Sequence, residues 1–226
     1  MRVLLKLSGE VLGGTQGMGH DERTLKHYAG VLSRIAEHHQ VAVVTGGGNI
    51  MRGKATQGLD RSKADQIGMM ATVVNCMTLE QHLVAVGTRA CAMSSVPSLA
   101  QPYDIVRARE LLSQGTIVFV AGGTSNPYFT TDSAAALRAL ELRCDLLVKA
   151  TKVDGVYDRD PRVHPEARRF EALSFDDAIA QNLGVMDLTA MVLCRENGLN
   201  LRVCHVDALS SFEGILDGTT PSTIVR

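Results

Sequence analysis

The sequence predicts an α/β fold, a three-layer α/β/α sandwich in which helices cover both faces of a mainly parallel sheet. Two observations carry this prediction. Apolar runs of strand length alternate with segments of helical period nearly throughout the 226 residues, and several runs end in glycine-rich polar turns. The chain also contains no linker rich in proline or serine, so residues 1–226 are expected to form a single domain.

The elements follow in order along the chain. The first strand, 2–7, is a mostly apolar run, and helix 21–37 carries Leu25, Leu32 and Ile35 at helical spacing with charged residues between them. Such a helix packs one face against a sheet. The remaining predicted strands are 41–45, 88–93, 116–121, 145–149 and 201–205, and the remaining predicted helices are 63–86, 130–142, 175–182 and 186–197.

The predicted helix 63–86 is apolar on more than one side. A helix covered on two sides is either central to a core or shared with another subunit, and the sequence leaves both alternatives open. The two apolar stripes are Ile67, Met70 and Val74, and Met69, Val73 and Cys76.

Composition excludes several classes of protein. The formal net charge of −1 lacks the basic excess expected of a general nucleic-acid binder. No apolar run approaches the ~20 residues of a membrane span, and Lys6 and Glu10 interrupt what would be the apolar part of a secretion signal. The five cysteines form no CxxC pair and are expected to be reduced core residues, with no zinc site. A cytoplasmic protein is expected.

The most informative segment is 118–136, with the sequence VFVAGGTSNPYFTTDSAAA. An apolar strand leads into Gly122 and Gly123, then a polar loop, then a helix start with Thr131, Asp132 and Ser133 as alternative caps. Glycines allow the backbone to approach a ligand closely, and the free N–H groups of a helix start favour an anion. The segment therefore predicts a phosphate site.

Two further strands end in the same way. Strand 2–7 leads into Ser8-Gly9-Glu10, and strand 41–45 leads into the glycines 46–48. In an open parallel sheet, ligands bind at the carboxyl ends of the strands, so three such turns describe a cleft with room for more than one phosphate. With Lys6 and Arg52 as nearby positive charges, this cleft suits phosphoryl transfer, which depends on positioning and charge neutralisation.

Each candidate residue also has a purely structural interpretation. Lys6 could extend to water from an edge strand, and Arg52 could be a solvated surface residue. Asp65 could be a helix N-terminal charge or an acceptor for ribose hydroxyls, and Asp132 could simply cap its helix. The segment 48–55, GNIMRGKA, resembles a Walker phosphate loop, but Ala55 stands where that motif needs a hydroxyl for Mg²⁺, so we reject it.

Six segments, in order along essentially the whole chain, carry a family resemblance. They are LLKLSGE at 4–10, VTGGGNIMRG at 44–53, ADQIGMMATVVN at 64–75, AGGTSNPYFTTDSAA at 121–135, LVKATKVDGVYDRDP at 147–161 and VMDLTA at 185–190. The chain resembles the bacterial uridylate kinases, a family within the amino acid kinase superfamily, and the fourth and fifth segments are long and specific. The resemblance implies an amino acid kinase-like fold and transfer of the γ-phosphoryl group of Mg·ATP to UMP, giving UDP and ADP in pyrimidine nucleotide biosynthesis.

The resemblance also implies roles for individual residues. ATP would be bound by Lys6, Leu7, Ser8, Gly9, Gly48, Arg52, Thr151, Tyr157 and Asp160. UMP would be bound by Gly47, Asp65, Thr124, Ser125, Asn126, Pro127, Tyr128, Phe129, Thr130 and Thr131. Lys6, Arg52 and Asp132 would be the catalytic residues, Asp132 organising either the lysine or the metal, and Mg²⁺ would enter with ATP rather than on protein ligands.

Members of this family are hexameric, and GTP and UTP act on many of them. The segment implied in GTP control is Gly14, Thr15, Gln16, Gly17, Met18 and Gly19. On the following long helix, however, Glu80, Gln81 and Val84 stand where basic residues are expected, so the resemblance does not fix whether GTP activates this chain.

Two other functions remain as alternatives. A kinase of the same superfamily acting on an amino-acid carboxylate would need a different acceptor site, and the loop 122–132 argues against one. A nucleotide-sensing module without catalysis would be favoured if Lys6 or Arg52 were absent, and both are present. A dinucleotide-dependent dehydrogenase is weaker still, because the chain has no GxGxxG after its first strand.

Overall fold

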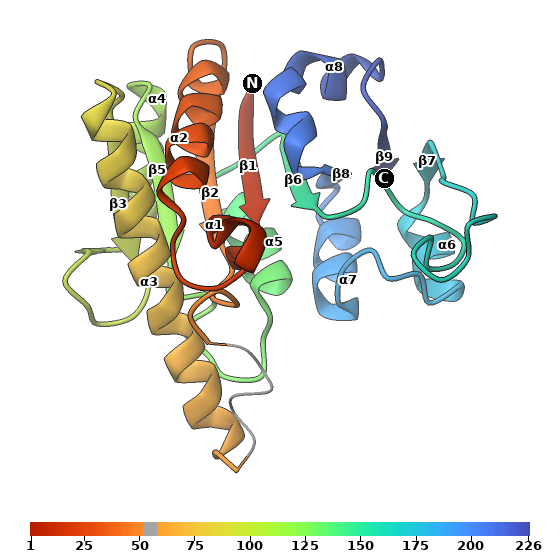
Figure 1. Ribbon diagram of the computed structural model, residues 1–226, viewed down its shortest axis with the longest axis horizontal. Helices are drawn as coiled ribbons and strands as arrows, with labels where there is room; N and C mark the ends of the chain where they lie inside the picture. The colour runs from red at the N-terminus through yellow and green to blue at the C-terminus, as the bar shows by residue number, and fades with distance from the viewer. Residues whose placement is uncertain (52–57) are drawn as a thin grey trace.

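The computed structural model describes residues 1–51 and 58–226. Its strands form one nine-stranded sheet in the order β4-β3-β5-β2-β1-β6-β8-β9-β7, with helices packed along it (Figure 1). Among the described strands, all pairings are parallel except that between β8 and β9. The predicted α/β fold with a mainly parallel sheet is therefore confirmed. The strands are β1 Arg2–Leu7, β2 Gln40–Thr45, β3 Ala90–Ser94, β4 Gln101–Pro102, β5 Ile117–Ala121, β6 Leu146–Thr151, β7 Ala172–Leu173, β8 Asn200–His205 and β9 Ser222–Val225.

The helices connect these strands in the crossovers that a parallel sheet requires. The five predicted helices are present within a few residues of their expected bounds. The described helices are α1 Gly9–Leu12, α2 Glu22–Ala36, α3 Arg61–Ala85, α4 Ile105–Ser113, α5 Thr131–Glu141, α6 Phe175–Ala180, α7 Leu188–Glu196 and α8 Phe212–Asp217, with the short 3₁₀ helices η1 Gly14–Gln16 and η3 Val206–Ser211. Within the described part of the chain, no helix has the length and apolar character needed to cross a membrane.

Two apolar cores lie on opposite faces of the sheet, which makes the structure three-layered. One core joins the strands to α2, α3 and α8, and the other joins them to α4, α5, α6 and α7. Successive side chains of a strand point to opposite faces, so Val3, Leu5 and Leu7 of β1 enter the first core while Leu4 enters the second. The same alternation places Lys6 on the face covered by α5 and α7.

The long helix α3 buries one of the two apolar stripes that its sequence carries. Met69, Val73 and Cys76 are buried. In contrast, Ile67, Met70 and Val74 are 41%, 44% and 47% exposed, so this stripe does not contribute to the core. Only one of the two apolar stripes is thus explained by packing within the chain.

The short or weakly patterned elements were not predicted from the sequence: α1, β4, α4, β7, α8 and β9. The prediction that Thr131, Asp132 or Ser133 caps α5 is wrong. The cap is Thr130, whose hydroxyl oxygen accepts from the N–H groups of Asp132 at 3.0 Å and Ser133 at 3.3 Å. Because Thr130 provides the cap, the carboxylate of Asp132 is available for other partners.

Candidate active site

The glycine turns after β1 and β2 are in direct contact at one edge of the sheet. The N–H of Gly46 donates to the carbonyl of Leu7 at 2.9 Å. A Cβ on Gly9 would lie 2.3 Å from the carbonyl oxygen of Gly46 and 2.6 Å from Oδ1 of Asn49. Gly9 is therefore required because no side chain fits between the two turns, as expected where backbone segments approach closely.

Two lysines and one aspartate form a triad at this edge. Lys6 of β1 and Lys149 of β6 are direct partners in the parallel register. Asp132, in the first turn of α5, reaches the Nζ atoms of Lys6 at 3.0 Å and Lys149 at 2.7 Å, one carboxylate oxygen to each lysine. All three side chains are only 14–15% exposed. The carbonyl of Val185 accepts a further hydrogen bond from Lys149 at 2.6 Å.

The charges of the triad are mutually dependent. Burial raises the pKa of the Asp132 carboxyl, but Lys6 and Lys149 outweigh burial and hold that pKa below its ordinary value. Burial lowers the pKa of Lys149, and Asp132 offsets this only in part. With both lysines protonated, the triad carries one net positive charge. Two ammonium groups held by a single carboxylate suit the binding of phosphate oxygens.

Asp187 links the helix that carries Asp132 to the neighbouring helix α7. It caps α7 by accepting from the N–H of Ala190 at 3.0 Å, and it accepts from the hydroxyl of Ser133 at 2.9 Å. The hydroxyl of Thr130, the cap of α5, also donates to Asp187. The N-termini of α5 and α7 are therefore joined beside the triad, and α7 is preceded by the carbonyl that accepts from Lys149.

A pocket of about 570 Å³ lies between the second and third glycine turns, within the range of small-molecule sites. It is bounded by α3 on one side and by the loop before α5 on the other. Thr131, which directly precedes Asp132 of the triad, is part of its wall. Its lining consists of Gly47, Met51, Arg61, Ala64, Asp65, Gly68, Met69, Thr72, Gly123, Thr124, Phe129, Thr130 and Thr131.

Asp65 ties α3 to the outer loop of this pocket. Its Oδ2 accepts from the backbone N–H of Tyr128 at 2.8 Å and from Nε of Arg61 at 2.9 Å. Burial raises the pKa of Asp65, but these hydrogen bonds and the charge of Arg61 outweigh it and lower the pKa. Tyr128 has a φ of 73°, which is unfavourable for a residue with a side chain, so its contact with Asp65 stabilises a strained loop.

A second pocket, of about 400 Å³, lies between the segments 153–162 and 181–184. Its lining includes Tyr157, Asp160 and Gly184, and Gly184 directly precedes the carbonyl of Val185 that binds Lys149. Hydrogen bonds from Arg162 lower the pKa of Asp160 to about 2. Each of the two pockets is thus lined by a chain neighbour of a residue that belongs to the triad or binds it, Thr131 in the first and Gly184 in the second.

The segment proposed for effector control contacts the second glycine turn through asparagines. The amide nitrogen of Asn49 donates to the carbonyl of Gly19 at 2.8 Å, and the N–H of Gly19 donates to the carbonyl of Asn49 at 2.8 Å. Asn75 of α3 donates to Oδ1 of Asn49 at 2.8 Å and to the carbonyl of Gly46 at 2.7 Å. The end of segment 14–19 is therefore anchored directly to the turn that lines the first pocket.

The structure brings together most of the residues that the sequence singled out. Six of the ten residues assigned to UMP line the first pocket, whereas Ser125, Asn126, Pro127 and Tyr128 form the outer part of its loop. The residues Leu7, Ser8 and Gly9 pass from β1 into α1, Gly48 faces Glu10, and Thr151 ends β6 two residues after Lys149. Tyr157 and Asp160 line the second pocket. Arg52 lies outside the described residues, as does the second half of the rejected segment 48–55.

Two residues of the site were missed by the sequence analysis. Lys149 is a charge inside an apolar strand, LLVKAT, which is the same signal that identified Lys6 in LLKL. Asp187 carries no such signal, because an aspartate before a helix is most often just its cap. Its second role, binding the cap of another helix, depends on tertiary structure.

Comparison with known proteins places this geometry in context. The model of the amino acid kinase family matches residues 1–205. The chain is 45% identical over 230 residues to a protein of Magnetococcus marinus named uridylate kinase, covering all of this chain and 95% of the relative. It is 47% identical over 210 residues to the uridylate kinase of Rickettsia bellii, covering 91% and 88% of the two chains.

Solved structures give the same grouping. The UMP kinase of Ureaplasma parvum superposes with a TM-score of 0.94 at 35% identity, covering all of this chain and 98% of the other. The UMP kinase of Bacillus anthracis superposes with a TM-score of 0.94 at 34% identity, covering all of this chain and 95% of the other. The resemblance therefore extends from the six sequence segments to the whole fold.

Proposed function

The chain belongs to the amino acid kinase family, and we propose that it is a UMP kinase, which transfers the γ-phosphoryl group of ATP to UMP. The observation that carries this proposal is the triad of Lys6, Asp132 and Lys149, with two pockets lined by the chain neighbours of Asp132 and of Val185. UMP would occupy the first pocket and ATP the second, so that the acceptor and donor phosphates meet at the triad. A carboxylate kinase and a non-catalytic sensor are not favoured by the relatives that match at full length.

The proposed mechanism is direct in-line transfer. The phosphate of UMP is largely ionised near neutral pH, so no general base is required. The ammonium groups of Lys6 and Lys149 would neutralise charge on the transferred group, and N–H groups of the glycine turns would fix its oxygens. Asp132 would hold the two ammonium groups at the spacing that the phosphates require.

The residues proposed to bind UMP lie in and around the first pocket. Asp65 would bind the ribose of UMP, and the loop 124–131 would enclose the base and phosphate, with Gly47 allowing the close approach of backbone. A Cβ on Gly47 would lie 2.8 Å from the carbonyl oxygen of Gly68, so the turn and α3 are packed too closely for a side chain there. This close packing supports a backbone contact with the ligand.

The residues proposed to bind ATP come mainly from the glycine turns after β1 and β2 and from the second pocket. The phosphates of ATP would contact the segment from Lys6 to Gly9 and Gly48, and Tyr157 and Asp160 would border the nucleoside, with Thr151 between them and the triad. Arg52 would add a positive charge. Residues 1–226 would act as a single domain, which the continuous sheet supports.

Magnesium would enter as Mg·ATP and would supply charge neutralisation of the phosphates. Asp132 is a poor metal ligand in this arrangement, because each of its carboxylate oxygens is engaged by a lysine. Of the two roles considered for Asp132, its contacts support the organisation of lysines. We therefore propose that the phosphates of ATP provide the main ligands of Mg²⁺.

The proposed function is tested by ADP formation from Mg·ATP with UMP, CMP, dUMP, AMP and N-acetylglutamate in turn. Turnover with UMP above all others is expected. Turnover with the amino acid alone would overturn the assignment to UMP, and ATP binding without any turnover would favour a sensor. Lys6→Ala is expected to lower kcat far more than it raises KM, because the lysine acts on the transition state. A change in KM alone would make Lys6 a binding residue.

The proposed function includes the assembly of several copies of the chain and its regulation by nucleotides. We propose a homo-oligomer, expected to be a hexamer, and the exposed stripe of Ile67, Met70 and Val74 supports an interface on α3. Size-exclusion chromatography with light scattering tests it, and a monomer at micromolar concentration would refute it. UTP is expected to compete with UMP. The substrates are cytoplasmic metabolites, so the enzyme is placed in the cytoplasm.

The contacts between segment 14–19 and the second glycine turn support an effector role for that segment. On α3, Glu80 accepts from the backbone N–H of Ala92 at 2.9 Å and therefore links the helix to strand β3. Because Glu80 replaces an expected basic residue, activation by GTP is not part of the proposal. The ADP assay repeated with and without GTP measures it directly.

A further inference from the structure

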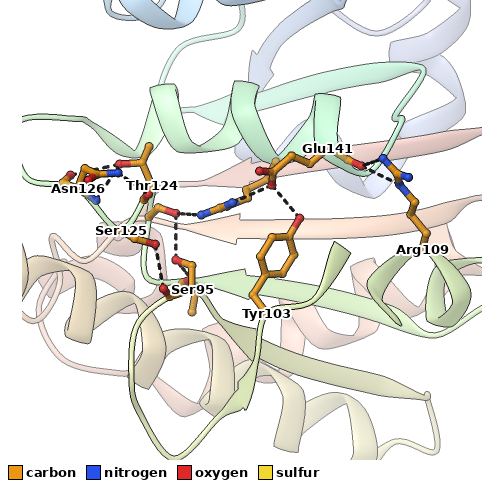
Figure 2. Close-up of polar contacts among 10 residues, drawn as sticks. Ser95, Tyr103, Arg109, Thr124, Ser125, Asn126 and Glu141 are labelled. Atoms are coloured by element: carbon orange, nitrogen blue, oxygen red, sulfur yellow. Dashed lines mark hydrogen bonds and ion pairs between the residues drawn. The ribbon is translucent and has the colours of Figure 1, made fainter. Parts of the chain in front are cut away.

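A polar cluster beneath the third glycine turn has no part in the proposed chemistry. Arg138 of α5 is 5% exposed, and its Nη1 contacts Oε2 of Glu141 at 2.7 Å. The hydroxyl of Tyr103 donates to the same carboxylate oxygen at 2.9 Å, and its ring faces the guanidinium at 4.7 Å. Figure 2 shows Tyr103 pointing toward Glu141 from the far side of the cluster. Arg138 is thus held from two sides.

The free end of this arginine reaches the turn that lines the first pocket. Nη2 of Arg138 donates to the carbonyl of Gly123 at 2.9 Å. Gly122 and Gly123 have φ values of 84° and 62°, so both adopt the left-handed conformation, and Gly123 contributes to the pocket wall. Gly123 lies beyond the end of β5, so its carbonyl has no partner in the sheet, and Arg138 provides a charged donor for it.

The same turn is connected onward to the loop that would enclose the acceptor. The hydroxyl of Ser95 lies 3.3 Å from the carbonyl oxygen of Gly123, and the hydroxyl of Ser125 donates to the carbonyl of Ser95 at 2.9 Å. Ser125 has a φ of 70°, which requires support from its surroundings. In Figure 2 these contacts form a continuous series from Tyr103 to Ser125.

We propose that Arg138, held by Glu141 and Tyr103, is a positioning residue for the acceptor phosphate and nucleoside. It would act through Gly123, fixing the start of the loop 124–131 and hence the shape of the first pocket. A buried ion pair such as that of Arg138 with Glu141 is often no more stabilising than well-packed apolar residues of the same volume. The use of an arginine aimed at one carbonyl of the pocket wall is explained by this role. The inference rests on UMP being the acceptor.

The test measures the KM for UMP and the KM for ATP separately. Arg138→Met keeps an unbranched stem but removes the guanidinium group and with it both hydrogen bonds, and the KM for UMP is expected to rise about tenfold, the effect of losing one hydrogen bond to a charged group. The KM for ATP is expected to change less than about twofold and kcat less than about threefold, because the second pocket and the triad are untouched. Arg138→Lys cannot serve Glu141 and Gly123 together, so an intermediate KM for UMP is expected.

Arg109→Met is the matched control. Nε of Arg109 donates to the backbone carbonyl of Glu141 at 2.7 Å, at the same end of α5, but Arg109 does not contact the glycine turn. This variant is expected to lose stability without a change in the KM for UMP. Tyr103→Phe, which removes one support of Glu141, is expected to raise that KM about two- to threefold.

Two results would overturn the proposal. One is an equal rise in the KM for UMP in Arg138→Met and Arg109→Met, and the other is a parallel rise in the KM for ATP. If Arg138→Met does not fold, Arg138→Lys and Tyr103→Phe decide the question, and an unchanged KM for UMP in both would refute the role. Absence of UMP turnover in the wild-type protein would instead refute the proposed function, so the two failures are distinct.

Discussion

Replacing Asp132 by asparagine tests the central feature of the site. The substitution removes the carboxylate that separates Lys6 and Lys149, which lie opposite each other on neighbouring strands. Like charges directly opposite in a sheet are destabilising. Lys149 retains the carbonyl of Val185 at 2.6 Å, but this dipole does not replace a full negative charge.

The ionisation of Lys149 limits how far Asp132→Asn can lower the free energy of unfolding. The variant can relieve the repulsion by releasing the proton of Lys149, and for a lysine of ordinary pKa, about 10.4, this costs about 4 kcal/mol at pH 7.5. Burial already holds the pKa of Lys149 below its ordinary value, so the actual cost is smaller. At about 2–4 °C per kcal/mol for a chain of this size, Tm falls by less than about 16 °C and the variant remains folded.

The pH dependence has a definite sign. In the variant, the folded pKa of Lys149 falls further below its unfolded value, so the unfolded state binds more protons between the two values and stability rises with pH through that window. The deficit relative to the wild type therefore shrinks above neutral pH. It also shrinks in acid, because the stabilisation from the lowered pKa of Asp132 is lost as the pH falls through the folded pKa.

The measurements are urea unfolding across the pH range and steady-state kinetics at pH 7.5. Asp132→Asn is expected to lower kcat about 10²-fold, as for the loss of one preorganised group that stabilises the transition state. Asp104→Asn is the control, since Asp104 caps α4 by accepting from Arg107 at 2.7 Å and is far from the triad along the sheet. A kcat within threefold of the wild type, or a stability deficit that grows between pH 7.5 and 9.5, would refute the reasoning.

Three further predictions follow from the same site. Lys149→Met is expected to lower kcat about 10²-fold with little change in the KM for UMP, measured by ADP release, because the ammonium acts on the transferred group. Asp65→Asn is expected to raise the KM for UMP about tenfold and to leave kcat nearly unchanged, since it would weaken both the proposed ribose contact and the support of the outer loop. Gly9→Ala is expected to abolish activity and lower Tm, because its Cβ would lie 2.3 Å from the carbonyl oxygen of Gly46. Gly30→Ala, inside α2 with 3.7 Å to its nearest neighbour, is the control and is expected to stabilise by about 0.5–1 kcal/mol. Activity retained in Gly9→Ala would contradict the close approach of the two turns.

Much of the fold could be predicted because its strands and helices have strong periodic patterns. The apolar runs at 2–7, 41–45 and 116–121 are buried strands, and three glycine turns lead away from neighbouring strands as expected. The C-terminal part of the sheet was predicted less completely. Strands β7 and β9 have only two and four residues, too few for periodicity to identify them, and the antiparallel pairing of β8 with β9 depends on tertiary packing.

The candidate site could be predicted at the level of segments but not of interactions. The sequence indicated that Asp132 begins a helix, and it left open whether the residue caps that helix or organises a lysine. The choice depends on Thr130, which provides the cap and also binds Asp187, 57 residues away in the chain. Because the role of Asp132 depends on residues that are distant in the sequence, no local pattern predicts it.

The position of Lys149 follows from a simple physical argument once the strand order is known. Lys6 and Lys149 each interrupt an apolar strand, and alternation directs both side chains to the face covered by α5 and α7. Parallel pairing in register then brings two positive charges side by side, which a sheet tolerates only with a counter-charge between them. The first turn of α5 supplies that charge as Asp132. Burying two lysines and an aspartate in this way lowers the stability of the fold. The arrangement is therefore best explained by the phosphates that the two lysines would bind.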